Sequence, residues 1–288
     1  MSSTGTVFME VAIPDSSLVD EQTKRDKSIK ISQISRACCI FRVGKIYIYR
    51  DKTSVSAQKD RKLLKAMLTY LDTPQYLRRK LFPIMDELEY AGILHPVKAP
   101  HHKSKKADIG DIRVAVLIEK KGRLYADIGL DSLSLFKGSG YAGKKINAKI
   151  VSIHPELVTR EADKQEIKEY WGYDVVETSL LNLLESNHNT EIIITSRDGK
   201  LFKNYENNLS ERIKTIKTLL LIFGSPRNGV PEILMAEGKM IKQYPSRINM
   251  FPFQGTETVR LEEAILGTLA IMNHYISKQS GPTIRLHH

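Results

Sequence analysis

The sequence is poor in cysteine. Its only cysteines, Cys38 and Cys39, are adjacent within an apolar stretch. Two adjacent cysteines exclude a disulfide framework, and no CxxC or Cys/His spacing suits zinc. We therefore expect no metal, and reduced thiols typical of a reducing compartment.

Long hydrophobic runs are absent as well. The chain does not begin with a basic segment followed by an apolar core, so we expect no secretory signal. Apolar runs such as Leu219–Phe223 are far too short for a membrane span. Together with the cysteine usage, these absences predict a cytoplasmic protein without a membrane partner.

Several common catalytic signatures are missing. The sequence contains no GxxxxGK[ST], HExxH or GxSxG pattern, which removes several enzyme classes. Residues 138–143, GSGYAG, match GxGxxG letter for letter, but the dinucleotide fingerprint needs a strand before it and a helix after it. The residues that follow, KKINAKIVSI, alternate as a strand. We interpret this match as a loop.

Positive charge is in excess. Lys and Arg number 44 against 33 Asp and Glu, a formal charge of +11 over 288 residues. Such an excess favours a polyanionic partner, and RNA or DNA rather than a membrane surface. A solvated basic surface explains the same excess, so charge alone leaves both readings open.

Strands alternate with helices at both ends of the chain, which indicates a mostly parallel sheet. Ligand sites in such sheets lie beyond the carboxyl ends of the strands, where TSRDGK, FGSPRNG and FPFQGTET are located. The pattern predicts strands at 6–13, 45–51, 191–196, 218–223 and 248–251, and helices at 31–41, 59–71, 73–94, 161–169, 179–186, 209–217, 231–237 and 257–276.

Residues 97–163 differ in character. A basic, polar stretch, APHHKSKK, is followed by short alternating runs joined by glycine turns. This pattern predicts a small β-barrel inserted into an α/β domain formed by 1–96 and 164–288. Within the stretch, His101 and His102 are either RNA contacts or solvated side chains.

The dense positive charge of the predicted barrel suits single-stranded nucleic acid. Tyr125, Phe136 and Tyr141 are candidate stacking surfaces, although for each one filling the barrel is the favoured reading. The candidate RNA-binding residues are Lys103, Lys105, Lys106, Lys120, Lys121 and Arg123.

FGSPRNG and QGTET, in this order and each after a buried strand, resemble the SPOUT superfamily of trefoil-knotted methyltransferases. The resemblance covers most of the chain, and its segment order resembles a subfamily with a small OB-like insertion. The segments that carry it are SQISRACCIFRVGKIYIY, PQYLRRKLFP, AGILHPVKAPHH, YWGY, TSRDGK, FGSPRNG and QGTETVRLEEA.

The resemblance implies a knotted, mostly parallel sheet flanked by helices, an inserted OB-like barrel, and S-adenosyl-L-methionine as cofactor. In this family two crossing loops bind the adenine and ribose largely through backbone groups. It also implies a homodimer, for which the apolar face of 257–276 is the candidate contact. That face carries Leu261, Ile265, Leu269 and Met272.

Carried over residue by residue, the resemblance names three cofactor loops. Glycines there permit close backbone approach, while Thr and Asn supply donors and acceptors. Thr256 or Thr258 is also a candidate N-cap. The cofactor candidates are Thr195, Arg197 and Gly199, then Phe223, Gly224, Ser225, Asn228 and Gly229, then Asn249, Phe251, Gly255, Thr256 and Thr258.

Two arginines are the catalytic candidates. Arg36 matches an arginine that faces the reacting site in the family. It is the first candidate to stabilise the anion of a base, and a structural ion pair is the alternative. Arg227, like Arg197, suits the methionine carboxylate or an RNA phosphate, and an exposed turn residue is the alternative for Arg227. No side chain stands out as a general base.

The sequence thus predicts an RNA methyltransferase acting on ribosomal RNA. A base nitrogen such as uridine N3 is preferred to a ribose 2′-hydroxyl as acceptor. Two other classes remain open: a non-catalytic RNA-binding or ribosome-assembly factor that keeps the cofactor-binding knot, and a nucleotide-binding α/β protein without methylation chemistry.

Overall fold

A computed structural model describes residues 7–54, 57–103, 106–185, 189–238 and 245–279. The chain divides into two compact units. One comprises Met1–Thr69, Glu87–His95 and Tyr173–His288, and the other Tyr70–Asp86 and Pro96–Gly172. The second unit is wider than the predicted insertion 97–163, because it also includes Tyr70–Asp86.

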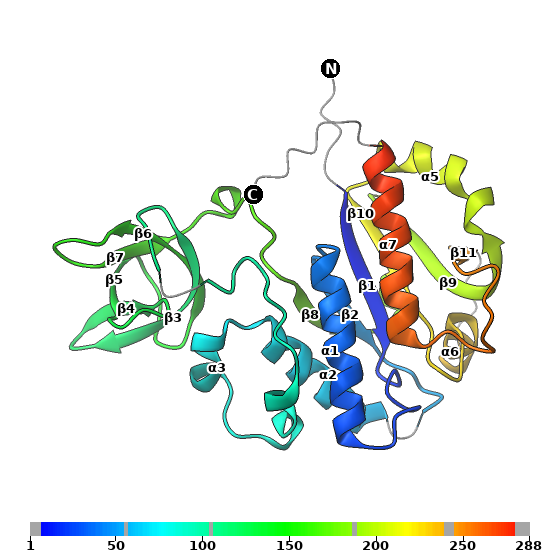
Figure 1. Ribbon diagram of the computed structural model, residues 1–288, viewed down its shortest axis with the longest axis horizontal. Coiled ribbons are helices and arrows are strands. Elements are labelled where there is room, and N and C mark those ends of the chain that lie inside the picture. The colour runs from blue at the N-terminus through cyan, green and yellow to red at the C-terminus, as the bar shows by residue number, and fades with distance from the viewer. Residues whose placement is uncertain (1–6, 55–56, 104–105, 186–188, 239–244, 280–288) are drawn as a thin grey trace. The chain divides into compact units, whose positions relative to one another are not determined.

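The first unit is built on a six-stranded sheet in the order β11-β9-β10-β1-β2-β8 (Figure 1). All five neighbouring pairs are parallel, which confirms the predicted parallel sheet. Its central strands are nearly all apolar because both faces are buried. The strands are β1 (Phe8–Pro14), β2 (Lys45–Tyr49), β8 (Asp174–Thr178), β9 (Thr190–Leu201), β10 (Thr218–Ile222) and β11 (Ser246–Asn249).

Helices flank this sheet, as predicted. Helix α1 (Lys24–Ile40) begins earlier than expected, because the Thr23 side chain accepts a hydrogen bond from the Asp26 amide and caps it. Figure 1 shows α1 and α7 (Leu261–Gln279) side by side in front of the sheet. The other helices of the unit are α2 (Ala57–Asp72), α4 (Leu180–Leu184), α5 (Glu206–Ile213) and α6 (Val230–Ala236).

The last helix differs from prediction in two ways. It begins at Leu261, where Glu263 accepts from the Arg260 amide at 2.9 Å, so neither Thr256 nor Thr258 is its N-cap. Its apolar face is also buried within the chain itself, so this face is not a free surface for a second copy. The buried residues include Leu261, Ile265, Leu269 and Met272.

Two other predicted helices are shorter in the structure. Of 73–94, only α3 (Gln75–Leu81) is α-helical, and two 3₁₀ turns, η1 (Asp86–Leu88) and η2 (Ala91–Ile93), follow Pro83. Of 161–169, only a 3₁₀ turn, η3 (Lys164–Glu166), is helical. The first residue of this predicted helix, Glu161, instead ends a strand of the barrel.

The second unit contains a closed five-stranded barrel in the order β3-β4-β5-β7-β6, which confirms the predicted barrel. Phe136 fills its core among small aliphatic residues, so the stacking alternative for Phe136 is wrong. Tyr125 is half-buried and Tyr141 exposed. The strands are β3 (Ile112–Lys120), β4 (Arg123–Asp127), β5 (Ser134–Lys137), β6 (Lys145–Ser152) and β7 (Val158–Glu161).

The two adjacent histidines of this unit both face the backbone of Asp72, and of the two only His102 is partly exposed. The Nε2 atoms of His101 and His102 lie 2.7 and 2.8 Å from the Asp72 carbonyl oxygen, and His101 is 1% exposed. Burial lowers the pKa of His102 to about 4. Gly172 allows this packing, because a Cβ there would lie 2.1 Å from Asp72 Oδ1.

Candidate functional site

Three segments at or just beyond the paired stretches of β9, β10 and β11 line one cavity of about 580 Å³. They come from the carboxyl ends of β9, β10 and β11, where ligand sites of open α/β sheets form. The volume is within the usual range for small-molecule sites, roughly 300–1,000 Å³. The segments are residues 195–198, 223–229 and 247–251, with Gln254, Glu257 and the start of α7 completing the wall.

The first segment was predicted as a turn, and the structure assigns it to β9. Its pairing with β11 nevertheless jumps from Ile194 to Lys200 between Arg247 and Ile248, so residues 195–199 lie between the two paired stretches. The Arg197 side chain is 65% exposed in this bulge. The bulge thus presents polar groups to the cavity while the strand continues.

Gly199 serves the crossing of these two strands rather than the cavity wall. A Cβ at Gly199 would lie 2.7 Å from the backbone of Arg247 and Ile248, and Gly199 is not among the lining residues. Its missing side chain therefore permits the close approach of β9 and β11.

The second segment is a tight turn closed on itself. The Ser225 amide donates to the Asn228 carbonyl at 2.8 Å, and the Asn228 amide donates to Ser225 Oγ at 2.9 Å. A Cβ on Gly224 would lie 2.8 Å from the Asn228 oxygen and 2.9 Å from Gly229 Cα. Only glycine fits at 224 with the turn in this form.

The Asn228 side chain ties this turn to the loop after β2. Its Nδ2 donates to Thr53 Oγ1 at 2.9 Å, and that hydroxyl donates to Asp51 Oδ1. The Asp51 amide donates to Asp15 Oδ1 at 2.9 Å. Asp15 and Asp51 are buried, and burial raises the pKa of Asp15. The side-chain amide of Asn228 is thus engaged by the protein.

The third segment is held by side chains that reach between loops. Asn249 Nδ2 donates to the Arg197 carbonyl at 2.7 Å, and Asn249 Oδ1 accepts from the Phe251 amide at 2.8 Å. The Phe251 ring lies against Gly267 of α7, where a Cβ would be 2.6 Å from the ring. The first and third segments and the last helix therefore form one connected wall.

The structure brings most predicted cofactor residues to this cavity and leaves three outside. Gly199, Gly255 and Thr256 do not line it. The predicted residues that do line it are Thr195, Arg197, Phe223, Gly224, Ser225, Asn228, Gly229, Asn249, Phe251 and Thr258.

The two arginines predicted as catalytic are separated. Arg227 lines the cavity. Arg36 is exposed on α1 and does not line it. Arg247 also lines the cavity, and sequence reasoning missed it because it lies within a strand.

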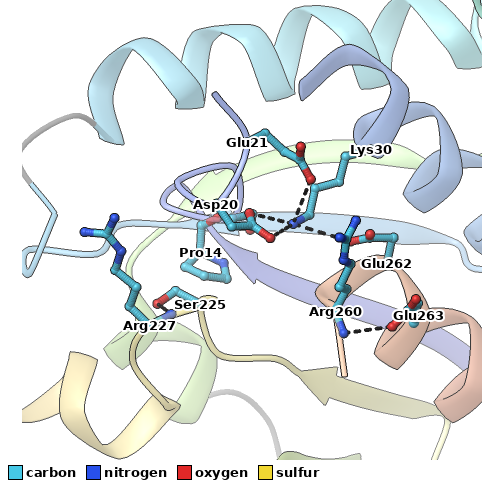
Figure 2. Close-up of polar contacts among 10 residues, drawn as sticks. Pro14, Asp20, Glu21, Lys30, Ser225, Arg227, Arg260, Glu262 and Glu263 are labelled. Carbon is cyan, nitrogen blue, oxygen red and sulfur yellow. Dashed lines mark hydrogen bonds and ion pairs between the residues drawn. The ribbon is translucent and has the colours of Figure 1, made fainter. Parts of the chain in front are cut away.

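A buried lysine beside the third segment was also missed. Lys30 of α1 is 1% exposed, and its Nζ lies 2.6 Å from Asp20 Oδ2 and 3.4 Å from Glu262 Oε2 (Figure 2). Glu21 is 3.9 Å away. Glu262 is the second residue of α7, so this cluster fixes the start of the helix whose first residue lines the cavity. A lysine among serines and isoleucines in a helix gives no sequence signal for such a role.

The chemistry available in this cavity is that of backbone groups, hydroxyls, amides, three arginines and the carboxylates of Asp198, Glu232 and Glu257. Among the residues described, no group of three or more His, Cys, Asp or Glu is arranged to hold a metal ion. No described helix is long and apolar enough to cross a membrane. The cavity suits a polar, uncharged ring system held by main-chain groups, with cations at its edge.

Comparison with known proteins supports a specific class. The profile of a family described as "Putative RNA methyltransferase" matches residues 8–272. A Drosophila melanogaster protein named 28S rRNA (uridine-N(3))-methyltransferase is 26% identical over 94% of this chain and 63% of its own length.

Two further relatives extend the comparison. A Homo sapiens protein with the same name is 24% identical over 92% of this chain and 77% of its own length. An uncharacterized Halobacterium salinarum protein is 28% identical over 90% of this chain and 96% of its own length. The chain therefore spans under two thirds of the fly relative and nearly all of the archaeal one.

Proposed function

The chain belongs to this RNA methyltransferase family, and from that premise we propose that it transfers a methyl group from S-adenosyl-L-methionine to ribosomal RNA. The proposed acceptor is a base nitrogen, uridine N3 ahead of a ribose 2′-hydroxyl. The observation that carries the proposal is the cavity formed by three segments at the carboxyl edge of the sheet. The printed names of the fly and human relatives support the acceptor.

The residues present fit the proposed cofactor. Gly224 lets the turn that lines the cavity close on itself, since a side chain there would meet Asn228 and Gly229. Thr195 and Thr258 add hydroxyls to the same wall, suited to a ribose or adenine. When bound, the cofactor supplies a methyl group already activated by its sulfonium.

For uridine N3 the chain must position a base and favour loss of its proton. The N3–H proton would pass to water, and the cavity would hold the base with the resulting N3 anion facing the methyl group that the bound cofactor would supply. Arg227 is the proposed group that stabilises the negative charge on the base. A base must leave its stack to reach such a site.

Arg36 keeps a catalytic role only as part of a proposed homodimer. Because it does not line the cavity of its own chain, it would have to act on the cavity of a second copy. The apolar face first considered for that contact is already buried, so the dimer would use another surface.

We also propose that the chain belongs to the SPOUT superfamily and that its sheet contains a trefoil knot. One feature of the fold supports this proposal. β11 is the edge strand next to β9, yet α7, which follows β11 in the chain, packs against α1. The proposal includes a methyltransferase domain of 1–96 and 164–288, an OB-like RNA-binding insertion of 97–163, and a cytoplasmic location.

The tether of the cofactor turn gives a first prediction. Thr53→Val removes the hydroxyl between Asn228 and Asp51 and keeps the side-chain shape. Loss of this hydrogen-bonded link should weaken S-adenosylhomocysteine binding roughly 5- to 10-fold. Titration calorimetry measures the change. Thr53→Ser keeps the hydroxyl and should bind like the parent. Equal binding by Thr53→Val and the parent would contradict this role.

The function itself is tested with a labelled methyl donor. The chain is incubated with unmodified ribosomal RNA transcripts, and the nucleosides are identified by mass spectrometry. We expect N3-methyluridine, and much less of it with Arg227→Ala. Label in a 2′-O-methyl nucleoside would overturn the acceptor. S-adenosylhomocysteine binding without label in any RNA would instead favour a non-catalytic RNA-binding factor.

A further inference from the structure

Four strands of the barrel begin or end on a cation at the same end of the barrel. β3 ends at Lys120 and β4 begins at Arg123, and these two residues pair across the hairpin. β5 ends at Lys137 and β6 begins at Lys145. β4 and β5 are antiparallel, as are β3 and β6, so all four termini point to the same end of the barrel. Lys145 pairs with Val116, four residues before Lys120, so it lies lower on the barrel wall than the hairpin.

This end carries an excess of positive charge. Lys121, in the hairpin turn, and Lys144, before β6, bring the cations to six, with Glu119 and Glu161 as the acidic neighbours. Lys144 Nζ lies 3.3 Å from Glu161 Oε2. Among the residues described, no carboxylate forms an ion pair with the other five cations. The end therefore presents charge that the barrel does not neutralise.

The loop between β5 and β6 lies closely against this end of the barrel. A Cβ on Gly138 would be 2.7 Å from the Phe136 ring, and one on Gly140 would be 2.5 Å from Leu117 Cδ1. Gly143 has φ +90, and its amide donates to the Leu117 carbonyl at 2.8 Å. These glycines make the loop a fixed part of the barrel.

Tyr141 is at the centre of that loop and is 70% exposed. The Lys144 amide donates to its carbonyl at 3.1 Å, which closes the loop beneath it. Because the Tyr141 ring is mostly exposed, it contributes little to the stability of the fold. Its exposed ring suits stacking against an unpaired base.

We propose that this end of the barrel, defined by Lys120, Lys121, Arg123, Lys137, Lys145 and Tyr141, binds single-stranded RNA. The cations contact phosphates and the Tyr141 ring stacks on a base. The inference rests on the proposed function in that the partner is RNA. It also gives the GSGYAG loop a role in RNA binding, whereas its match to GxGxxG would suggest dinucleotide binding.

The surface divides the lysines predicted from sequence. Lys120, Lys121 and Arg123 belong to it. Lys106 precedes β3, where its carbonyl accepts from buried Arg113, and Lys103 pairs with Glu169 at 3.1 Å. Neither is part of the proposed surface, and Lys105 lies outside the described residues.

The test measures RNA binding apart from methyl transfer. Fluorescence anisotropy of a labelled 12-nucleotide oligouridylate is recorded with the full chain over a range of salt concentrations, without cofactor. The double variant Lys120→Ala/Lys121→Ala should bind more weakly, and its slope of log affinity against log salt should be shallower by about 1.4, since each single-strand phosphate contact contributes about 0.7. The matched control Lys164→Ala/Lys168→Ala removes two exposed lysines on and after η3 and should keep the parent slope.

Tyr141 provides the second arm. Tyr141→Ala should weaken binding about 10-fold, from a stacking contribution of about 1–3 kcal/mol, while Tyr141→Phe keeps the ring and should bind like the parent. No binding by the parent chain, or equal loss in the control lysine pair, would overturn the surface. Competition by an acidic peptide as strong as by RNA would assign it to a protein partner instead. Methyl transfer to ribosomal RNA is scored separately, so failure here does not decide the enzyme assignment.

Discussion

Gly224→Ala is expected to weaken binding of S-adenosylhomocysteine roughly 10- to 100-fold, from a strain of about 1–3 kcal/mol. The added Cβ would lie 2.8 Å from the Asn228 carbonyl oxygen, so the turn that faces the cavity must open. Titration calorimetry at a temperature well below unfolding measures the change. The proposed RNA-binding end of the barrel is untouched, so oligouridylate binding should stay at the parent value.

Gly255→Ala is the matched control for this substitution. A Cβ at Gly255 meets no atom within 4 Å, and Gly255 does not line the cavity. We expect parent-like binding, although the family resemblance names Gly255 as a cofactor residue. Equal weakening by both substitutions would favour the resemblance over the geometry, and parent-like binding by Gly224→Ala would remove the turn from the cofactor site.

Lys30→Met is expected to lower the free energy of unfolding by about 3–5 kcal/mol, because it leaves the buried Glu262 carboxylate without its cation. Lys30 Nζ is the shared partner of Asp20 and Glu262, and Glu262 is itself buried. Chemical denaturation at neutral pH measures the change. Cofactor affinity should fall as well, because the same cluster holds the start of α7 at the cavity wall.

The double variant Lys30→Met/Glu262→Gln separates charge from packing. Removing one of the unpaired carboxylates should recover part of the stability lost in Lys30→Met. As a surface control, Lys65→Met breaks an exposed pair with Glu177 and should change stability by less than about 1 kcal/mol. If Lys65→Met and Lys30→Met lowered the free energy of unfolding by similar amounts, burial of Lys30 would not be the reason for the large effect.

The periodic parts of the chain could be predicted, because burial on a sheet or helix face leaves a repeating pattern. The apolar run TLLLI predicted the strand β10, and the short alternating runs predicted the barrel. The N-terminus of α7 could not be predicted this way. Thr256 and Thr258 are good caps by type, but the Glu263 side chain accepts from the Arg260 amide and starts the helix three residues after Thr258.

The candidate site was predictable where glycine turns follow buried strands, as at Gly224 and Gly229. It was not predictable where the decisive contacts are long-range. The tether from Asn228 to Thr53 joins residues 175 apart in sequence, and Lys30 meets Glu262 only through packing of α1 on α7. Gly199 was named for the cofactor, and the contact that the structure gives it is the close approach of β9 to β11.

A crystal structure of the chain with S-adenosylhomocysteine tests the central claim most directly. We predict that the adenosine lies in the cavity between residues 223–229 and 249–258, with main-chain groups of both segments hydrogen-bonded to it and Thr195 beside it. Adenosine bound anywhere else, or a cavity that stays empty at saturating ligand, would contradict the account.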